Sequence, residues 1–120
     1  MIIKDLSEAL EFLAGDHTRL RELLNPAKER LALRYSLAHA AVAPSARTKR
    51  HRLRTSEVYY ILEGRGLMHI DLESAPVKSG QAVYIPPGAV QWIENTGATP
   101  LVFLCIVDPA WRPEDEEVLE

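Results

Sequence analysis

The amino-acid sequence predicts a small all-β domain. Two observations carry this prediction. From residue 31 onward, apolar and polar residues alternate with the two-residue period of β-strands, and turn residues interrupt this alternation about every 8 to 12 residues. Short strands at this spacing are typical of an antiparallel sandwich or barrel. With 120 residues the chain has room for one core, so we expect a single domain.

Residues 1–30 form an arm ahead of the predicted barrel. Residues 5–14 are mostly good helix formers; an Asp or a Ser can cap the start and Gly15 can end the run, which predicts a short helix. Residues 18–24 alternate too loosely to distinguish a helix from a strand. We therefore expect a short helix or strand arm in this region.

The predicted barrel occupies residues 31–107. In its first strand, the odd positions from 31 to 39 carry Leu, Leu, Tyr, Leu and His, whereas the even positions from 34 to 42 carry Arg, Ser, Ala, Ala and Val. The strand therefore has two different faces. Further strands are predicted at 48–53, 58–62, 67–71, 82–85, 90–94 and 101–107, with Gly- or Pro-containing turns between most of them. Residues 108–120 follow as an acidic tail.

The composition is that of an ordinary globular protein, with 47% hydrophobic and 26% charged residues. No apolar run approaches the roughly 20 residues of a membrane span, and no secretory leader is visible. We therefore expect a cytoplasmic protein with no membrane contact. Cys105 is the only cysteine, which excludes an internal disulfide, and its apolar neighbours predict a buried thiol.

The net charge of −3 is unevenly distributed. Basic residues crowd positions 47–54 and acidic residues crowd positions 114–120. An acidic chain without a reading helix or stacking aromatics is not typical of nucleic-acid-binding proteins, so we expect no nucleic-acid partner. The basic segment has three interpretations: a solvated edge, a contact with the acidic tail, or a site mouth at which Arg50 and Arg52 attract an anionic substrate.

Two segments carry most of the functional information. The first contains His51, Leu53, Glu57 and Gly64, and the second contains Gly80, Pro86, Gly88, Gln91 and Asn95. Their spacings resemble the paired motifs of the cupin superfamily, G-x5-H-x-H-x3/4-E-x6-G and G-x5-P-x-G-x2-H-x3-N. Three positions depart from these motifs: Ser45 stands at the opening Gly, and Leu53 and Gln91 stand at two of the His positions.

This resemblance implies a small single-domain cupin of the conserved-barrel "cupin 2" type, with a jelly-roll barrel (a double-stranded β-helix) at residues 31–107. It also favours a strand for residues 18–24. Residue parity agrees with the motif: if the arginines at positions 50, 52 and 54 face water, His51 and Leu53 face the interior. Glu57 and Tyr59 on the next strand, and Gln91 on a later one, then share that interior.

The resemblance also implies a divalent metal ion, because cupins bind iron, manganese, nickel, zinc or copper with these motif residues. Carried over by position, His51 and Glu57 are ligands and Gln91 offers its amide oxygen, whereas Leu53 cannot ligate. Two of the four usual ligands are thus replaced, which predicts weak metal binding and open coordination positions. His39 is a possible additional ligand, although its parity differs from that of the positions the family pattern turns inward.

Two functions follow as alternatives. One is an enzyme of isomerase, cyclase or oxygenase type in which a metal ion polarises a small metabolite while Tyr59 or Glu57 moves protons. The other is a non-catalytic, metal-free module that binds or senses a small ligand, with His51, Glu57 and Gln91 in a hydrogen-bonded cluster. No nucleophilic triad or phosphate loop is visible.

We also expect a homodimer. Apolar residues occupy both parities of residues 101–107, but a small barrel has only one interior. The outer apolar face therefore needs cover from the N-terminal arm or from a second subunit.

Overall fold

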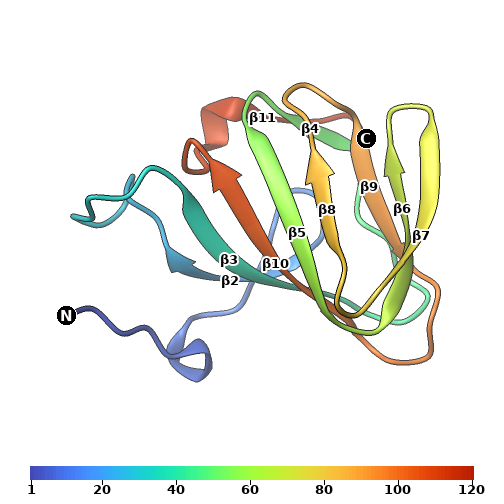
Figure 1. Cartoon of the computed structure of the whole chain (residues 1–120), viewed down its shortest axis with the longest axis horizontal. Helices are drawn as coiled ribbons and strands as arrows, with labels where there is room; N and C mark the ends of the chain where they lie inside the picture. The colour runs from blue at the N-terminus through green and yellow to red at the C-terminus, as the bar shows by residue number, and fades with distance from the viewer.

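The chain folds into two antiparallel sheets that face each other (Figure 1). This computed structural model describes all 120 residues. The first sheet has the order β1 (Phe12–Leu13), β2 (Arg19–Leu24), β3 (Ser36–Val42), β10 (Leu101–Asp108), β5 (Ser56–Glu63) and β8 (Ala82–Ile85). The second has the order β11 (Glu116–Val118), β4 (His51–Leu53), β9 (Gln91–Asn95), β6 (Arg65–Ile70) and β7 (Glu73–Lys78). The predicted all-β class is confirmed, as a double-sheet jelly roll.

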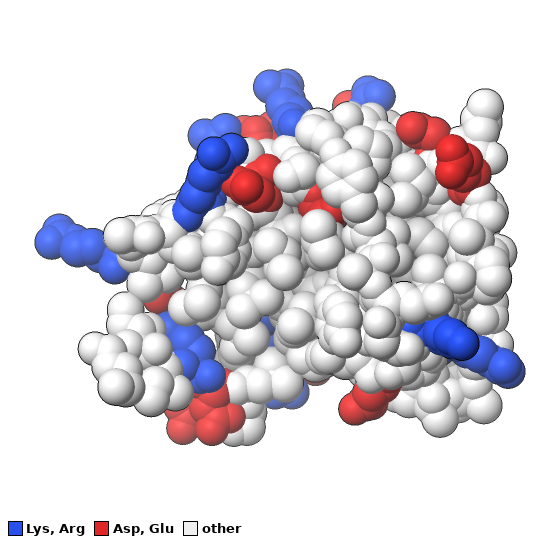
Figure 2. Space-filling model, viewed as in Figure 1, with Lys and Arg blue, Asp and Glu red and all other residues white.

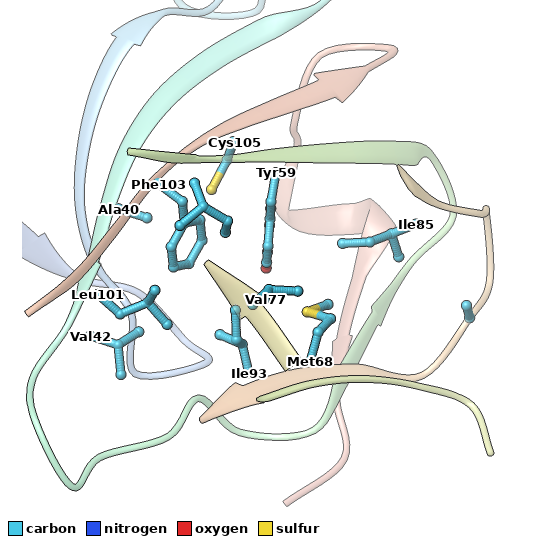
Figure 3. Packing of buried hydrophobic residues seen from close by; sticks show 12 residues of the cluster. Ala40, Val42, Tyr59, Met68, Val77, Ile85, Ile93, Leu101, Phe103 and Cys105 are labelled. Atoms are coloured by element: carbon cyan, nitrogen blue, oxygen red, sulfur yellow. The ribbon is translucent and has the colours of Figure 1, made fainter. Parts of the chain in front are cut away.

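The hydrophobic core lies between the sheets and follows the predicted alternation. On β10, Leu101, Phe103, Cys105 and Val107 are buried, while the residues between them are only half-buried. Phe103 packs against Tyr59 of β5 with ring centroids 4.4 Å apart (Figure 3). Ile93 of β9 is fully buried in the same cluster, so one core joins both sheets.

The outer face of the six-stranded sheet is apolar over β5, β8 and β10. Tyr60, Leu62 and Tyr84 are exposed there, and Leu104 and Ile106 are half-buried. Figure 2 shows a broad area without Lys, Arg, Asp or Glu across the middle of the molecule, where these strands lie in the same view. The N-terminal arm does not cover this area, since its strands β1 and β2 extend the opposite edge of the sheet, beyond β3 (Figure 1).

The N-terminal arm contains one 3-10 turn and two strands. The helix expected over residues 5–14 is reduced to η1 (Leu6–Glu8), which Asp5 caps by accepting a hydrogen bond from the Ser7 backbone N–H. No residue of η1 is buried, and an unpacked helix this short is marginal in water. The strand favoured for residues 18–24 is confirmed as β2, which pairs with β3.

The acidic tail is an integral part of the second sheet. After η2 (Pro113–Asp115), β11 pairs antiparallel with β4, so that Glu117 lies opposite Arg52. The two side chains form an ion pair of 2.8 Å, and Arg47 and Arg50 both pair with Glu120. The basic segment therefore contacts the acidic tail, which is one of the roles the sequence suggests.

Besides the two-residue β1, which lies within the expected helix, two strands have no counterpart in the sequence prediction. In β7 only Val77 is buried, and the strand contains Pro76, so it lacks the alternation by which a strand is recognised. β11 is a three-residue edge strand within a run of acidic residues. No helix in the structure is long and apolar enough to span a membrane.

Candidate functional site

A cavity of about 180 Å³ opens between the sheets. Its walls come from the N-terminal arm, β3, β4, β5, β10 and the C-terminal segment, and it contains Asp16, His51, Glu57 and Glu116. His51 and Glu57 were expected here from their motif positions. The alternation of β4, which buries His51 and Leu53 and exposes Arg52, turns the imidazole inward.

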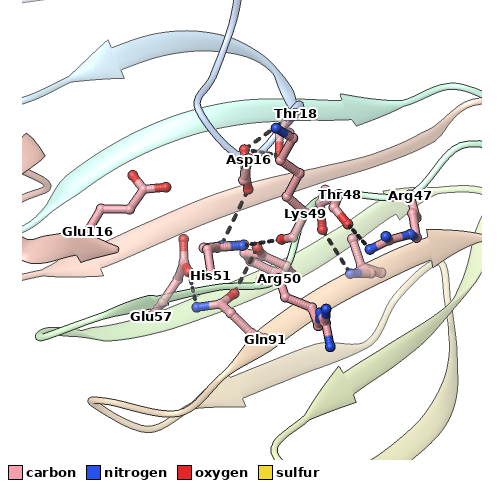
Figure 4. Close-up of polar contacts among 12 residues, drawn as sticks. Asp16, Thr18, Arg47, Thr48, Lys49, Arg50, His51, Glu57, Gln91 and Glu116 are labelled. Atoms are coloured by element: carbon pink, nitrogen blue, oxygen red, sulfur yellow. Dashed lines mark hydrogen bonds and ion pairs between the residues drawn. The ribbon is translucent and has the colours of Figure 1, made fainter. Parts of the chain in front are cut away.

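His51 is fixed by its backbone environment. Its Nδ1 lies 2.7 Å from the carbonyl oxygen of Lys49, which can only accept, so Nδ1–H is the donor of this bond (Figure 4). The other ring nitrogen, Nε2, lies 3.4 Å from Asp16 Oδ2. A backbone carbonyl that holds one ring nitrogen and frees the other is the usual support of a metal-binding histidine.

Asp16 and Glu116 complete a three-residue cluster with His51. One ligand atom from each residue lies within 4.8 Å of the other two. Asp16 Oδ1 accepts hydrogen bonds from the backbone and the hydroxyl of Thr18 (Figure 4). Glu116 Oε2 accepts one of 2.8 Å from Trp111 Nε1. Each carboxylate is thus oriented through one oxygen, with the second available for another partner.

The cluster brings two carboxylates, one buried and one half-buried, close to one ring nitrogen of His51. An uncompensated charge in such surroundings is costly. A proton within the cluster or a bound metal ion can compensate it. One nitrogen and two oxygen donors suit a first-row divalent ion, so these residues fit a metal.

A second polar group lies deeper between the sheets. Gln91 Nε2 donates to Glu57 Oε1 at 3.0 Å, and the Tyr59 hydroxyl donates to Gln91 Oε1 at 3.1 Å. Gln91 is 1% exposed and does not line the cavity. The amide oxygen expected to bind a metal therefore accepts a hydrogen bond from Tyr59 instead.

Burial dominates the ionisation of this group. It raises the pKa of Glu57 to about 8, against the opposing hydrogen bond from Gln91 and with a further rise from the charges of Asp16 and Glu116. Burial also raises the pKa of Tyr59 well above its ordinary value, and it raises the pKa of Glu116 despite the hydrogen bond from Trp111. Glu57 is therefore a carboxylic acid at neutral pH in the metal-free protein.

Three other predicted residues lie away from the cavity. His39 is on the outer face of β3, opposite to the inward Ala38 and Ala40, where burial and Arg21 lower its pKa. Arg50 and Arg52 are exposed on the outer face of β4, in ion pairs with the tail. The structure brings none of the three to the site.

Two residues of the cluster were missed from the sequence. Asp16 lies in an irregular segment before β2, and Glu116 lies in an acidic run that looks like a solvated tail. The available signals were weak: an Asp-x-Thr spacing typical of a local side-chain turn at Asp16, and a tryptophan five residues before Glu116. Neither signal points to His51.

These features define a double-sheet β-protein with an internal polar site, and the comparisons agree. The family model described as "Cupin domain" matches residues 38–107, which is more than half of the chain. The chain therefore belongs to the cupin family.

Individual proteins and a solved structure are also similar to this chain. An uncharacterized protein of Methanocaldococcus jannaschii is 44% identical over 110 residues, which cover 91% of this chain and 87% of that protein. An oxalate-binding protein of Thermotoga maritima is 41% identical over 51 residues, or 42% of each protein. The crystal structure of a predicted oxalate decarboxylase from Thermotoga maritima matches with a TM-score of 0.78 at 25% identity, covering 90% of this chain and 99% of that one.

The raised pKa of Glu57 predicts the pH dependence of stability. Between its ordinary pKa of 4.5 and its folded pKa of about 8, the folded state holds a proton that the unfolded state releases. The free energy of unfolding of the metal-free protein should therefore fall by a few kcal/mol as pH rises across this window. Glu57→Gln keeps a carbonyl acceptor for Gln91 and should flatten most of this decline in urea titrations from pH 5 to 8.

The matched control is Glu63→Gln, on the exposed end of the same strand. It should retain the wild-type pH dependence. If Glu57→Gln also retains it, Glu57 is ionised in the folded protein and the assignment of its proton is wrong.

Proposed function

We propose that this protein is a small-molecule cupin that binds a divalent cation in its cavity and acts on a small ligand held beside it. The observation that carries the proposal is the convergence of Asp16, His51 and Glu116 with three acceptor atoms within 4.8 Å of one another. The cation site shares His51 with the ligand set implied by the motif. Asp16 and Glu116 replace Glu57 and Gln91 in it.

The neighbouring residues suit proton transfer to a bound ligand. When bound, the cation supplies Lewis-acid polarisation of a carbonyl, enediol or carboxylate. Glu57 lines the cavity and is the group that holds or moves a proton at its carboxyl oxygens. Gln91 orients this carboxyl, and Tyr59 orients Gln91 through the hydrogen bond to its amide oxygen. Isomerisation, cyclisation and oxygenation all fit this arrangement.

One observation favours a second function, a metal-free module that binds or senses a small ligand. Leu53 removes one usual ligand, and Gln91 is engaged with Glu57 and Tyr59. A proton on His51 Nε2 would then satisfy Asp16 and Glu116 without a metal. The two functions differ in what the purified protein contains.

Elemental analysis separates them. The metal-binding function predicts about one equivalent of manganese, iron or another first-row ion per chain after incubation and desalting. Asp16→Asn, His51→Ala and Glu116→Gln should each lower the affinity about tenfold or more, because the first and third replace an anionic donor with a weaker neutral one and the second removes the imidazole.

Two controls sharpen this experiment. Glu117→Gln, the neighbour of Glu116 on the outer face of β11, should leave the metal content unchanged. Glu57→Gln distinguishes the two ligand sets: loss of metal in this variant but not in Asp16→Asn would favour the set implied by the motif. No metal in the wild-type protein would leave the metal-free function.

We further propose that the protein is a homodimer that buries the outer face of the six-stranded sheet. The support is the uncharged area over β5, β8 and β10, where Tyr60, Leu62 and Tyr84 are exposed (Figure 2). Monomeric proteins seldom expose a continuous apolar patch of this kind. A second copy presents the same area, so a two-fold axis through it covers both.

Analytical ultracentrifugation tests the dimer. Tyr60→Glu places a charge in the middle of the area and should shift the protein to a monomer. Leu72→Glu, at a fully exposed turn away from it, should remain a dimer. A wild-type monomer at micromolar concentration contradicts the proposal.

A further inference from the structure

The cavity contains no positively charged side chain except, if protonated, His51. The ionisable groups that line it include Asp16, Glu22, Glu57 and Glu116, and no Lys or Arg lines it. Lys28 is paired with Glu22 at 2.8 Å and lies against the outside of Trp111, with Nζ 5.6 Å from the ring centroid. Arg50 and Arg52 are on the outer face of β4 in ion pairs. A bound cation at Asp16, His51 and Glu116 is therefore the one place in the cavity that attracts an anionic group.

Most of the wall is apolar, and Leu53 is part of it. Ten of the eighteen lining residues are hydrophobic, including the aromatic residues Phe12, Tyr59 and Trp111. Leu53 is 4% exposed and lines the cavity at the motif position where a second histidine ligand is usual. The substitution that removes a metal ligand thus adds apolar surface facing the ligand.

The size of the cavity limits this apolar part. A cavity of about 180 Å³ is close to an apolar cavity of about 150 Å³ that accommodates benzene. There is room for a ligand of about six carbons in all, including one polar head group at the cation. No Lys or Arg lines the cavity, so a second carboxylate at the far end of such a body would have no cationic partner there.

From these three observations we infer the ligand class: a small molecule with one metal-binding head group, such as a carboxylate, and an apolar body with no charge at its far end. This inference rests on the proposed metal-binding function. It makes Leu53 a specificity-determining residue, because its side chain gives the cavity apolar surface at a position where the motif has an ionisable ligand.

The test compares hexanoate with adipate, which have equal chain length and differ in the second terminal carboxylate. Manganese-loaded protein is titrated with each acid, and paramagnetic broadening of the ligand proton resonances gives the affinity. Hexanoate should bind at least about tenfold more tightly than adipate. Equal affinity, tighter binding of adipate, or no broadening of either acid at millimolar concentration overturns the inference.

A pair of variants tests whether the preference for hexanoate over adipate arises at the cavity wall. Leu53→Lys places a cation beside the body of the ligand and should bring the affinity ratio to one or reverse it. Leu72→Lys adds the same charge at an exposed turn and should preserve the ratio. Thermal unfolding checks that Leu53→Lys is folded. If this variant does not fold, the comparison of hexanoate and adipate on the wild-type protein alone decides the inference.

The outcomes distinguish a failure of the inferred ligand class from a failure of the proposed metal-binding function. Protein that takes up no manganese refutes the proposed metal site, and the metal-bound head group with it. Protein that takes up manganese but prefers adipate refutes only the ligand class.

Discussion

The site depends on the buried imidazole of His51, in which one ring nitrogen bonds to the backbone and the other faces the carboxylates of the cluster. The Nδ1 atom of His51 is held by a backbone carbonyl, so Nε2 must face the interior, where Asp16 and Glu116 meet it. Carboxylates in a mostly apolar cavity are unfavourable unless a cation or a proton lies between them. This requirement supports the proposal that the cluster holds a cation.

The two ends of the chain meet at this imidazole, which explains the architecture around it. The arm delivers Asp16 and is tied to the strand region by the Lys49 backbone N–H, which donates to the Asp16 carbonyl at 2.7 Å. The tail delivers Glu116 on β11, held by ladder bonds to β4 and by the pairs of Arg52 and Arg47 with acidic residues. Exposed ion pairs are individually weak, so the ladder and the network together position the carboxylate.

The sequence predicts the part of the site that local alternation controls. The parity of β4 and β5 placed His51, Leu53, Glu57 and Tyr59 inside, and all four are buried. Asp16 and Glu116 were not predicted, because they reach His51 only through pairing of the arm and of β11 with the β4 region, far away in the sequence. Gln91 was predicted inside correctly, but no spacing rule indicates that its amide bridges Glu57 and Tyr59. The expected helix is absent because this segment packs too little against the rest of the chain: Leu10 and Leu13 are exposed, and a helix of this length without packing is marginal in water.

The proposed cation site uses residues near both chain ends and differs from the ligand set implied by the motif alone. Anomalous diffraction from crystals grown with manganese measures this directly. If Asp16, His51 and Glu116 hold the ion, one anomalous peak lies about 2.0–2.3 Å from His51 Nε2 and from carboxylate oxygens of Asp16 and Glu116. A peak coordinated by Glu57 and Gln91, with Asp16 and Glu116 outside ligand distance, would contradict it.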